Sequence, residues 1–289
     1  MGKKDNTPLL LKVVRWLFPR LEKFAPALAH RYFLKIFFTP LRYKTPDKEH
    51  LAQTYAREFR FAAAGKEVQG YEWGEAGRPY ILLIHGWAGR TTQFRRFVKP
   101  LIQSGFRIIG FDGPAHGRSS GKRTSIDEFA ETMKVIFASH GEPAGVLAHS
   151  FGGVAALYAI VNGLPIRRLV NIASPSIGDE VIKTYLSAVN GSWSTGEFFK
   201  SHVLKTTGKT FDEFSALHFV KHLPHEVDLL LVHDENDREV AIKHAEKLIK
   251  AYPQAALIRT RKLGHTRILK DDEVIRRIVT FLRDKASAK

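Results

Sequence analysis

The sequence feature that most constrains this chain is the segment GVLAHSFGGVAALYAI at residues 145–160. Its first residues form an apolar run typical of a buried strand, and its last residues have the alanine and leucine content of a helix. The segment therefore predicts a strand that turns directly into a helix, with Ser150 at the turn. Such a turn brings neighbouring backbone very close, which favours the small residues Ala148 and Gly152 on either side of the serine.

A second predicted strand ends in a loop that the serine could use. Residues 80–84, YILLI, form a continuous apolar run of the kind found in buried parallel strands, and the dipeptide His85-Gly86 follows directly. A glycine at this point lets the following backbone turn inward. We therefore expect the N–H of Trp87 to face the region in front of the serine.

A third predicted strand, residues 106–111, leads into the loop DGPAHGRS. Its Asp112 and His116 are chemically suited to catalysis, but we expect both to be structural, because side chains in such a loop cap it by hydrogen bonds. Ser125 then marks the start of a helix that runs to about His140. This part of the chain is expected to support the site without taking part in the chemistry.

The last two predicted strands are followed by an acid and by a base. The strand at residues 227–232 is followed by HDENDREV, which contains Asp234, Glu235 and Asp237. The strand at residues 256–260 leads through Gly264 to His265. Because parallel strands end at the same edge of a sheet, these side chains are expected to converge on Ser150.

These motifs together resemble the α/β-hydrolase superfamily. The pentapeptide AHSFG matches its G-x-S-x-G turn with alanine in place of the first glycine, and the chain order Ser150, Asp237, His265 is the order that the superfamily uses. One departure is Asp234, which stands where the acid loop of the superfamily has a glycine. Because of this departure, Asp234 and Glu235 remain alternatives to Asp237 for the role of the acid.

The resemblance covers about residues 55–285 and implies an α/β fold. It implies a mostly parallel central sheet flanked by helices, within a hydrolase domain at residues 51–289. The segment at about 176–223 contains no apolar run typical of a strand, and its position matches the helical cap insertion of the superfamily. Several aromatic residues in it suggest an apolar pocket, one or two of them lining it.

The resemblance also implies chemistry. Ser150 would be the nucleophile, His265 its base, Asp237 the acid that orients the base, and the N–H groups of Trp87 and Phe151 the oxyanion hole. The expected substrate is a small-molecule ester with an apolar acyl group, cleaved with neither cofactor nor metal. A thioesterase, a carbon–carbon bond hydrolase and a non-catalytic binding protein on the same scaffold are the alternatives. His85 and His149 are expected to be structural.

Charge and the amino-terminal segment add a second question. The chain has a net charge of +16 and no cysteine, which fits a reducing, cytoplasmic compartment. No basic run is interleaved with aromatics as in a nucleic-acid module, so we expect no nucleic-acid partner. Residues 1–50 form a basic, amphipathic, helical extension, divided into two or three short helices at Pro19, Pro26 and Pro40.

Two interpretations of this extension remain. It either packs on the catalytic domain, or residues 9–43 lie in peripheral contact with the inner face of an anionic membrane. The apolar runs are too short and too charged to span a bilayer.

Overall fold

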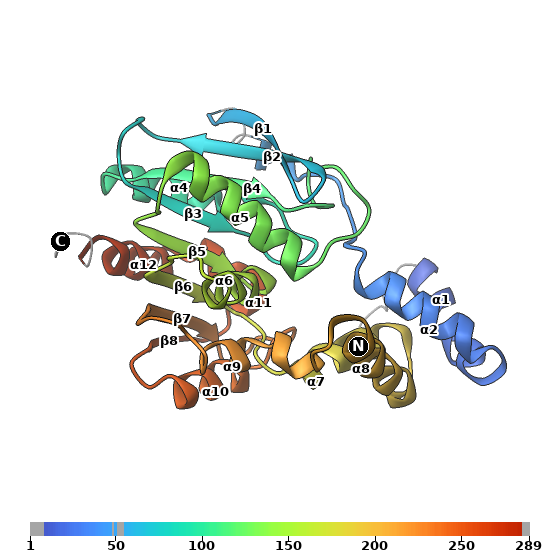
Figure 1. Ribbon diagram of the computed structural model, residues 1–289. Helices are drawn as coiled ribbons and strands as arrows, with labels where there is room; N and C mark the ends of the chain where they lie inside the picture. Colours follow the sequence, from blue (N-terminus) through green and yellow to red (C-terminus); the bar gives the residue numbers. More distant parts are fainter. Residues whose placement is uncertain (1–8, 48, 51–54, 285–289) are drawn as a thin grey trace, which may run out of the picture. The chain divides into compact units, whose positions relative to one another are not determined.

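The computed structural model describes residues 9–47, 49–50 and 55–284 of the chain, which form two compact units (Figure 1). The first, called the helical unit below, combines the chain up to Thr39 with Ile177–Phe214. The second, called the sheet unit, begins at Pro40, is interrupted by that insertion and resumes at Ser215. Each unit is described by itself.

An eight-stranded sheet is the centre of the sheet unit, with the strand order β1-β2-β4-β3-β5-β6-β7-β8. The first two strands pair antiparallel and β2 joins β4 antiparallel, whereas all the pairs from β4 to β8 are parallel. The strands are β1 Arg57–Ala63, β2 Lys66–Trp73, β3 Tyr80–Ile84, β4 Arg107–Asp112, β5 Gly145–His149, β6 Arg168–Ile172, β7 Asp228–Asp234 and β8 Ala256–Thr260.

The strands β3, β4, β5, β7 and β8 lie within two residues of the positions predicted from the sequence. All five residues of β3 and all five of β5 are buried. Burial on both faces explains why β3 is an unbroken apolar run and why β5 is apolar between its terminal Gly145 and His149. The predicted mostly parallel α/β fold is confirmed. In this arrangement the loops that follow β3, β5, β7 and β8 share one edge of the sheet, where the predicted site residues lie.

Helices cover both faces of this sheet. On one face α4 and α12 supply Phe97, Leu101 and Ile278 to a core that includes Leu83 and Leu147 of the sheet. On the other face α5 and α6 lie side by side (Figure 1). The helical segments of this unit are η1 Thr91–Phe94, α4 Arg95–Gln103, α5 Ile126–His140, α6 Phe151–Val161, α9 Ala216–Phe219, α10 Lys243–Ala251, α11 Gly264–Arg267, η3 Ile268–Lys270 and α12 Asp272–Asp284.

The helical unit is assembled from two distant parts of the sequence. Its elements are α1 Leu9–Phe24, α2 Pro26–Phe37, α7 Gly178–Val189, α8 Trp193–Thr207 and η2 Phe211–Phe214. Phe18 and Phe33 of the first pair are fully buried in one cluster with Ile182, Leu186 and Phe199 of the second. The carboxylate of Glu22 accepts hydrogen bonds from Ser192 and Thr195 at the start of α8, where an anion favours the helix.

One prediction for the amino-terminal segment is wrong. Pro26 does begin a helix, but Pro19 lies inside α1 and does not end it. Because proline has no N–H, it leaves the carbonyl of Arg15, four residues earlier, without its helical donor. The side-chain amide of Asn190 donates to that carbonyl at 3.3 Å, so a residue of α7's carboxyl end replaces the missing bond.

The aromatic residues of the insertion are mostly structural. The rings of Phe199 and Phe211 meet edge to face with centroids 5.0 Å apart, and the ring of Phe37 of α2 contacts both, tilted against Phe199 and edge to face with Phe211. Phe219 belongs to the sheet unit, where it contacts Tyr158. Across the described residues, no helix has both the length and the apolar character needed to cross a membrane.

Candidate active site

Ser150 occupies the strained turn between β5 and α6. Its φ of 52° and ψ of −123° put a residue with a side chain in a region that favours glycine, which costs backbone free energy. The turn is held from two sides: the N–H of Ser150 donates to Ile172 at 2.8 Å, and the hydroxyl of Ser174 donates to the Ser150 carbonyl at 2.8 Å. The strand β6 therefore fixes the backbone that presents the serine.

Two glycines allow the loop after β3 to approach this turn. A Cβ atom on Gly152 would lie 2.4 Å from the carbonyl oxygen of Ile84, and one on Gly86 would lie 2.9 Å from the Cβ of Ser150. Real Cβ atoms do not come so close to other heavy atoms. The small residues on both sides therefore let β3 and its loop contact the serine turn directly.

Trp87 and Phe151, the two residues expected to supply the oxyanion hole, are neighbours. Their rings meet edge to face with centroids 5.2 Å apart. Within the part of the chain that the structure describes, neither N–H donates a hydrogen bond to another residue. Both groups are therefore available for an oxygen atom of a bound substrate.

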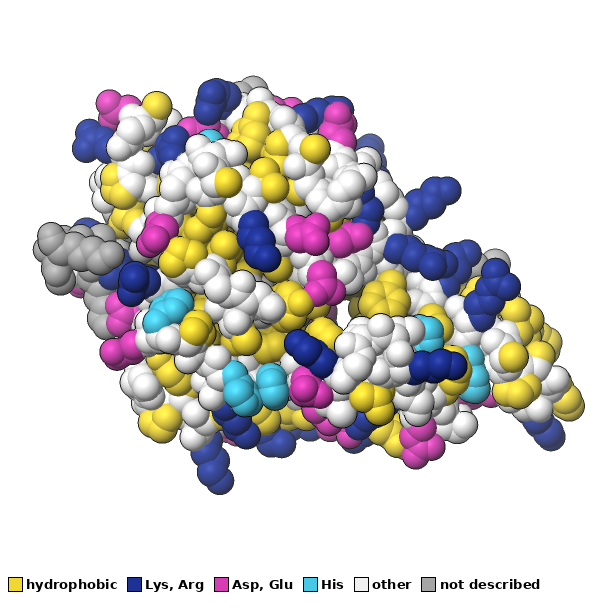
Figure 2. All heavy atoms as spheres, in the orientation of Figure 1, with side chains coloured by type: hydrophobic (Ala, Val, Ile, Leu, Met, Phe, Trp, Pro, Cys, Tyr) yellow, Lys and Arg dark blue, Asp and Glu magenta, His cyan; other side chains and the backbone are white. Residues whose placement is uncertain are grey.

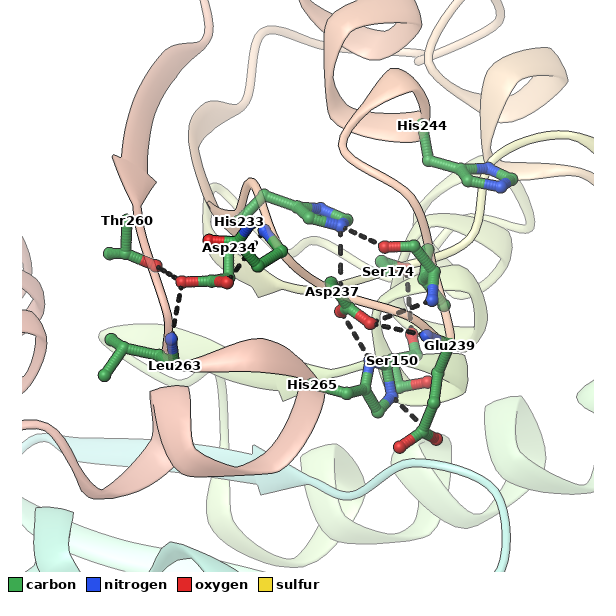
Figure 3. Close-up of polar contacts among 12 residues, drawn as sticks. Ser150, Ser174, His233, Asp234, Asp237, Glu239, His244, Thr260, Leu263 and His265 are labelled. Atoms are coloured by element: carbon green, nitrogen blue, oxygen red, sulfur yellow. Dashed lines mark hydrogen bonds and ion pairs between the residues drawn. The ribbon is translucent and has the colours of Figure 1, made fainter. Parts of the chain in front are cut away.

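Asp237 and His265 form a buried pair (Figure 3). One carboxylate oxygen, Oδ2, accepts the Nδ1–H of His265 at 2.8 Å, while Oδ1 accepts the backbone N–H groups of Glu239 at 2.8 Å and Val240 at 3.0 Å. Burial acts to raise the pKa of Asp237, but its hydrogen bonds with His265 and the two N–H groups hold that pKa below its ordinary value. Asp237 is thus ionised at neutral pH, and because it accepts from Nδ1, a neutral imidazole would carry its proton there and leave Nε2 without one.

The two rival acids have other partners. Asp234 accepts hydrogen bonds from Asn236, Thr260 and Leu263 and so holds the loop that carries His265. Glu235 forms an ion pair with Arg261 at 2.6 Å on the surface. Of the three carboxylates, Asp237 is the one in contact with the imidazole.

Ser150 and His265 lie next to each other in the close-up (Figure 3), although the described side chains share no hydrogen bond. His265 belongs to α11, directly after β8, and Ser150 follows β5. The contact between a nucleophile and its base is often long when no substrate is bound. The structure thus brings together Ser150, His265 and Asp237, the three residues whose convergence the sequence predicts.

Buried histidines around the site are held neutral. His149 lies beneath His265, with ring centroids 4.7 Å apart, and its Nε2 donates to the His265 carbonyl at 2.9 Å. Burial, assisted by the neighbouring His265, lowers the pKa of His149 to about 3. Burial likewise lowers the pKa of His85 to about 4 and that of His116 to about 3. Uncharged, these rings pack and donate single hydrogen bonds.

The loop after β4 is structural, as predicted. The carboxylate of Asp112 accepts the backbone N–H groups of Thr91 and Arg118, each at 2.9 Å, and His85 accepts the N–H of Gly113 at 2.8 Å. These bonds join the loop to the one that carries Trp87.

The sequence did not point to three residues that the structure places around Ser150, Asp237 and His265. The hydroxyl of Ser174 donates to the carbonyl of Ser150. His233 donates to the Val240 carbonyl at 2.7 Å and so supports the loop of Asp237. The carboxylate of Glu239 lies 4.0 Å from Nε2 of His265. Their closeness to Asp237 in the chain is the one signal that could have identified two of them.

No group of three or more His, Asp or Glu side chains among the described residues is arranged to hold a metal ion. The arrangement can polarise and attack a carbonyl carbon with a serine oxygen, using a histidine as the proton carrier.

Known proteins resemble this chain in sequence and in fold. A family profile described as the alpha/beta hydrolase fold matches residues 79–270. A serine hydrolase-like protein of Danio rerio is 32% identical over 111 residues, which cover 36% of this chain and 33% of that protein. The matched segment spans between a third and about half of the length of the first relatives of this kind.

Solved structures share the fold at low identity. An esterase of Pyrococcus furiosus superposes with a TM-score of 0.65 at 18% identity, covering 85% of this chain and 98% of that one. A membrane phospholipase A, described as a bacterial virulence factor, superposes with a TM-score of 0.63 at 16% identity, covering 97% of this chain and 98% of its own.

Proposed function

Because the chain belongs to the alpha/beta hydrolase fold family, we propose that it is a serine hydrolase that cleaves a carboxylic ester with an apolar acyl group. The observation that carries this proposal is the contact of an ionised, buried Asp237 with His265 beside the strained turn of Ser150. Serine hydrolase-like relatives and an esterase of the same fold support it.

In the proposed reaction the oxygen of Ser150 attacks the carbonyl carbon while its proton passes to Nε2 of His265. The negative charge that develops on the carbonyl oxygen is stabilised by the N–H groups of Trp87 and Phe151. One such donor is typically worth about 10²–10³ in rate. Asp237 stabilises the imidazolium, which then protonates the departing alcohol.

The acyl group stays on Ser150 as an ester until a water molecule hydrolyses it by the same type of attack. His265 removes a proton from the water molecule as it attacks, and returns that proton to the serine oxygen when the acid leaves. Every step thus uses the same two side chains, and no co-reactant other than water is needed.

The apolar acyl group is supported by the surroundings of the serine. The rings of Trp87 and Phe151 lie together at the proposed oxyanion hole. The solved structures that share this fold include a membrane phospholipase A and an esterase.

The test combines labelling with turnover. Wild-type protein and Ser150→Ala are treated with a fluorophosphonate probe and assayed on p-nitrophenyl esters from acetyl to palmitoyl. We expect labelling and turnover in the wild type only, with Ser150→Ala slower by several orders of magnitude and equally folded.

Other results lead elsewhere. Labelling of Ser150 without hydrolysis of any ester would replace the ester proposal by a thioester or a carbon–carbon substrate. The absence of both labelling and turnover would refute a serine hydrolase and favour a binding protein on this scaffold.

A further inference from the structure

The helices α1 and α2 each have two distinct faces. The inner face carries Phe18, Ala29 and Phe33, which are 2%, 0% and 0% exposed in the core of the helical unit. These residues account for the packing of both helices against α7 and α8. The side chains on the opposite face, called the outer face below, take no part in that core.

The outer face is unusually apolar for an exposed surface. Its large apolar side chains recur at helical spacing, so those of α1 form one stripe. They are Val13 (49% exposed), Trp16 (59%), Leu17 (41%), Phe24 (76%), Leu28 (45%) and Tyr32 (49%). An apolar surface of this extent on a folded protein marks an interaction site.

Cations are placed directly beside these aromatic residues. The guanidinium of Arg20 lies 3.9 Å from the ring centre of Trp16, the ammonium of Lys23 lies 5.4 Å from that of Phe24, and the ammonium of Lys35 lies 5.9 Å from that of Tyr32. In Figure 2 the atoms of this helix pair show apolar and basic side chains intermingled.

Acidic groups are absent from the same face. Over the described residues of the two helices Glu22 is the one acid, and its carboxylate is bound by Ser192 and Thr195 of the helical unit. The outer face is therefore positive as well as apolar, within a chain whose net charge is +16.

We propose that the outer face of α1 and α2 binds the surface of a bilayer that contains anionic lipids. Aromatic and aliphatic side chains would enter the boundary between headgroups and acyl chains, while the neighbouring cations pair with lipid phosphates and carboxylates. Long basic side chains can extend along the apolar surface to reach those headgroups. The helices would lie in the plane of the membrane, since neither can span it.

A lipid surface explains both properties of the face at once. A nucleic acid would satisfy the cations but offer nothing to Val13, Leu17 and Leu28, which have no planar ring to stack on a base. A second copy of the chain would bury the apolar side chains but bring two positive faces together.

The experiment is flotation of the full chain with vesicles of phosphatidylcholine, with and without phosphatidylserine. We expect binding to the vesicles with phosphatidylserine, weakened as salt is raised. Trp16→Ser with Phe24→Ser should weaken binding roughly a hundredfold or more, since each aromatic side chain that enters the lipid boundary is worth about one order of magnitude. Lys23→Gln with Lys35→Gln should weaken it about 25-fold, about fivefold per cation.

Matched substitutions elsewhere serve as the control. Leu204→Ser with Lys205→Gln changes an apolar side chain, 49% exposed, and a cation on α8, and should leave binding unchanged. Equal binding by the wild type and both outer-face variants would overturn the proposal. Equal binding to vesicles without phosphatidylserine, or binding to RNA and not to vesicles, would also overturn it. A dimer that does not bind vesicles, and that dissociates when Trp16 and Phe24 are changed, would do the same.

Discussion

Replacing Asp237 by asparagine would change the protonation of His265 without changing the shape of the site. In the wild type, Oδ1 of Asp237 accepts two backbone N–H groups and Oδ2 accepts the Nδ1–H of His265 at 2.8 Å. The asparagine oxygen would stay with the two N–H groups, so its NH₂ group would face Nδ1. An NH₂ group can only donate, and Nδ1 would then have to be the unprotonated nitrogen.

The consequence falls on the other ring nitrogen. With its proton on Nε2, His265 cannot remove the proton of Ser150. In serine hydrolases with this arrangement, the wrong tautomer lowers turnover by about 10⁴. A factor of 10⁴ corresponds to about 5.5 kcal/mol in the activation free energy.

The assay is kcat/KM for the best p-nitrophenyl ester, with the thermal unfolding midpoint as a check on folding. Asp234→Asn is the matched control, because Asp234 is equally buried but bonds Thr260 and Leu263 instead of the imidazole. We expect it to lose stability while keeping activity within about tenfold of wild type. A folded Asp237→Asn variant within about tenfold of wild type would refute the proposed role of Asp237.

Three other predictions concern the fold. The first concerns three buried histidines that are neutral in the folded protein: His85, His116 and His149. Below about pH 6.5 each gains a proton on unfolding, so the free energy of unfolding should fall with decreasing pH by up to ~1.4 kcal/mol per pH unit for each histidine. Urea titrations at several pH values test this. Asn190→Gly keeps the left-handed backbone but removes the donor to Arg15, and should cost about 0.5–1.5 kcal/mol by denaturant melts; an unchanged midpoint would contradict this account of Pro19. Gly152→Ala should cost about 1–3 kcal/mol, since its Cβ would meet the Ile84 carbonyl, and a wild-type melting temperature would contradict the close packing.

The central strands of the sheet could be predicted because they are buried on both faces. Residues such as 80–84 and 145–149 read as apolar runs whatever surrounds them, and the loop that follows each one carries polar residues at a fixed edge. Convergence of Ser150, Asp237 and His265 then follows from topology alone. The roles of these residues in catalysis remain predictions.

What the sequence could not provide depends on contacts between distant residues. Pro19 is a helix breaker by local rules, yet α1 continues through it, and the carbonyl of Arg15 accepts instead from the amide of Asn190, far along the chain. The choice between Asp234 and Asp237 stayed open for the same reason, since both follow one strand and only the backbone of the loop decides which faces His265. No local pattern indicates that His149 bonds the carbonyl of His265.

The discontinuous origin of the helical unit has a consequence for biosynthesis. A ribosome completes α1 and α2 early, but their packing partner α7 begins only at Gly178. At synthesis rates of ~5–20 residues per second, on the order of ten seconds pass between the synthesis of Phe18 and Phe33 and that of the helices that bury them. During that interval the nascent helices expose apolar residues on both faces, so a chaperone or a membrane can bind them before the catalytic sheet is complete.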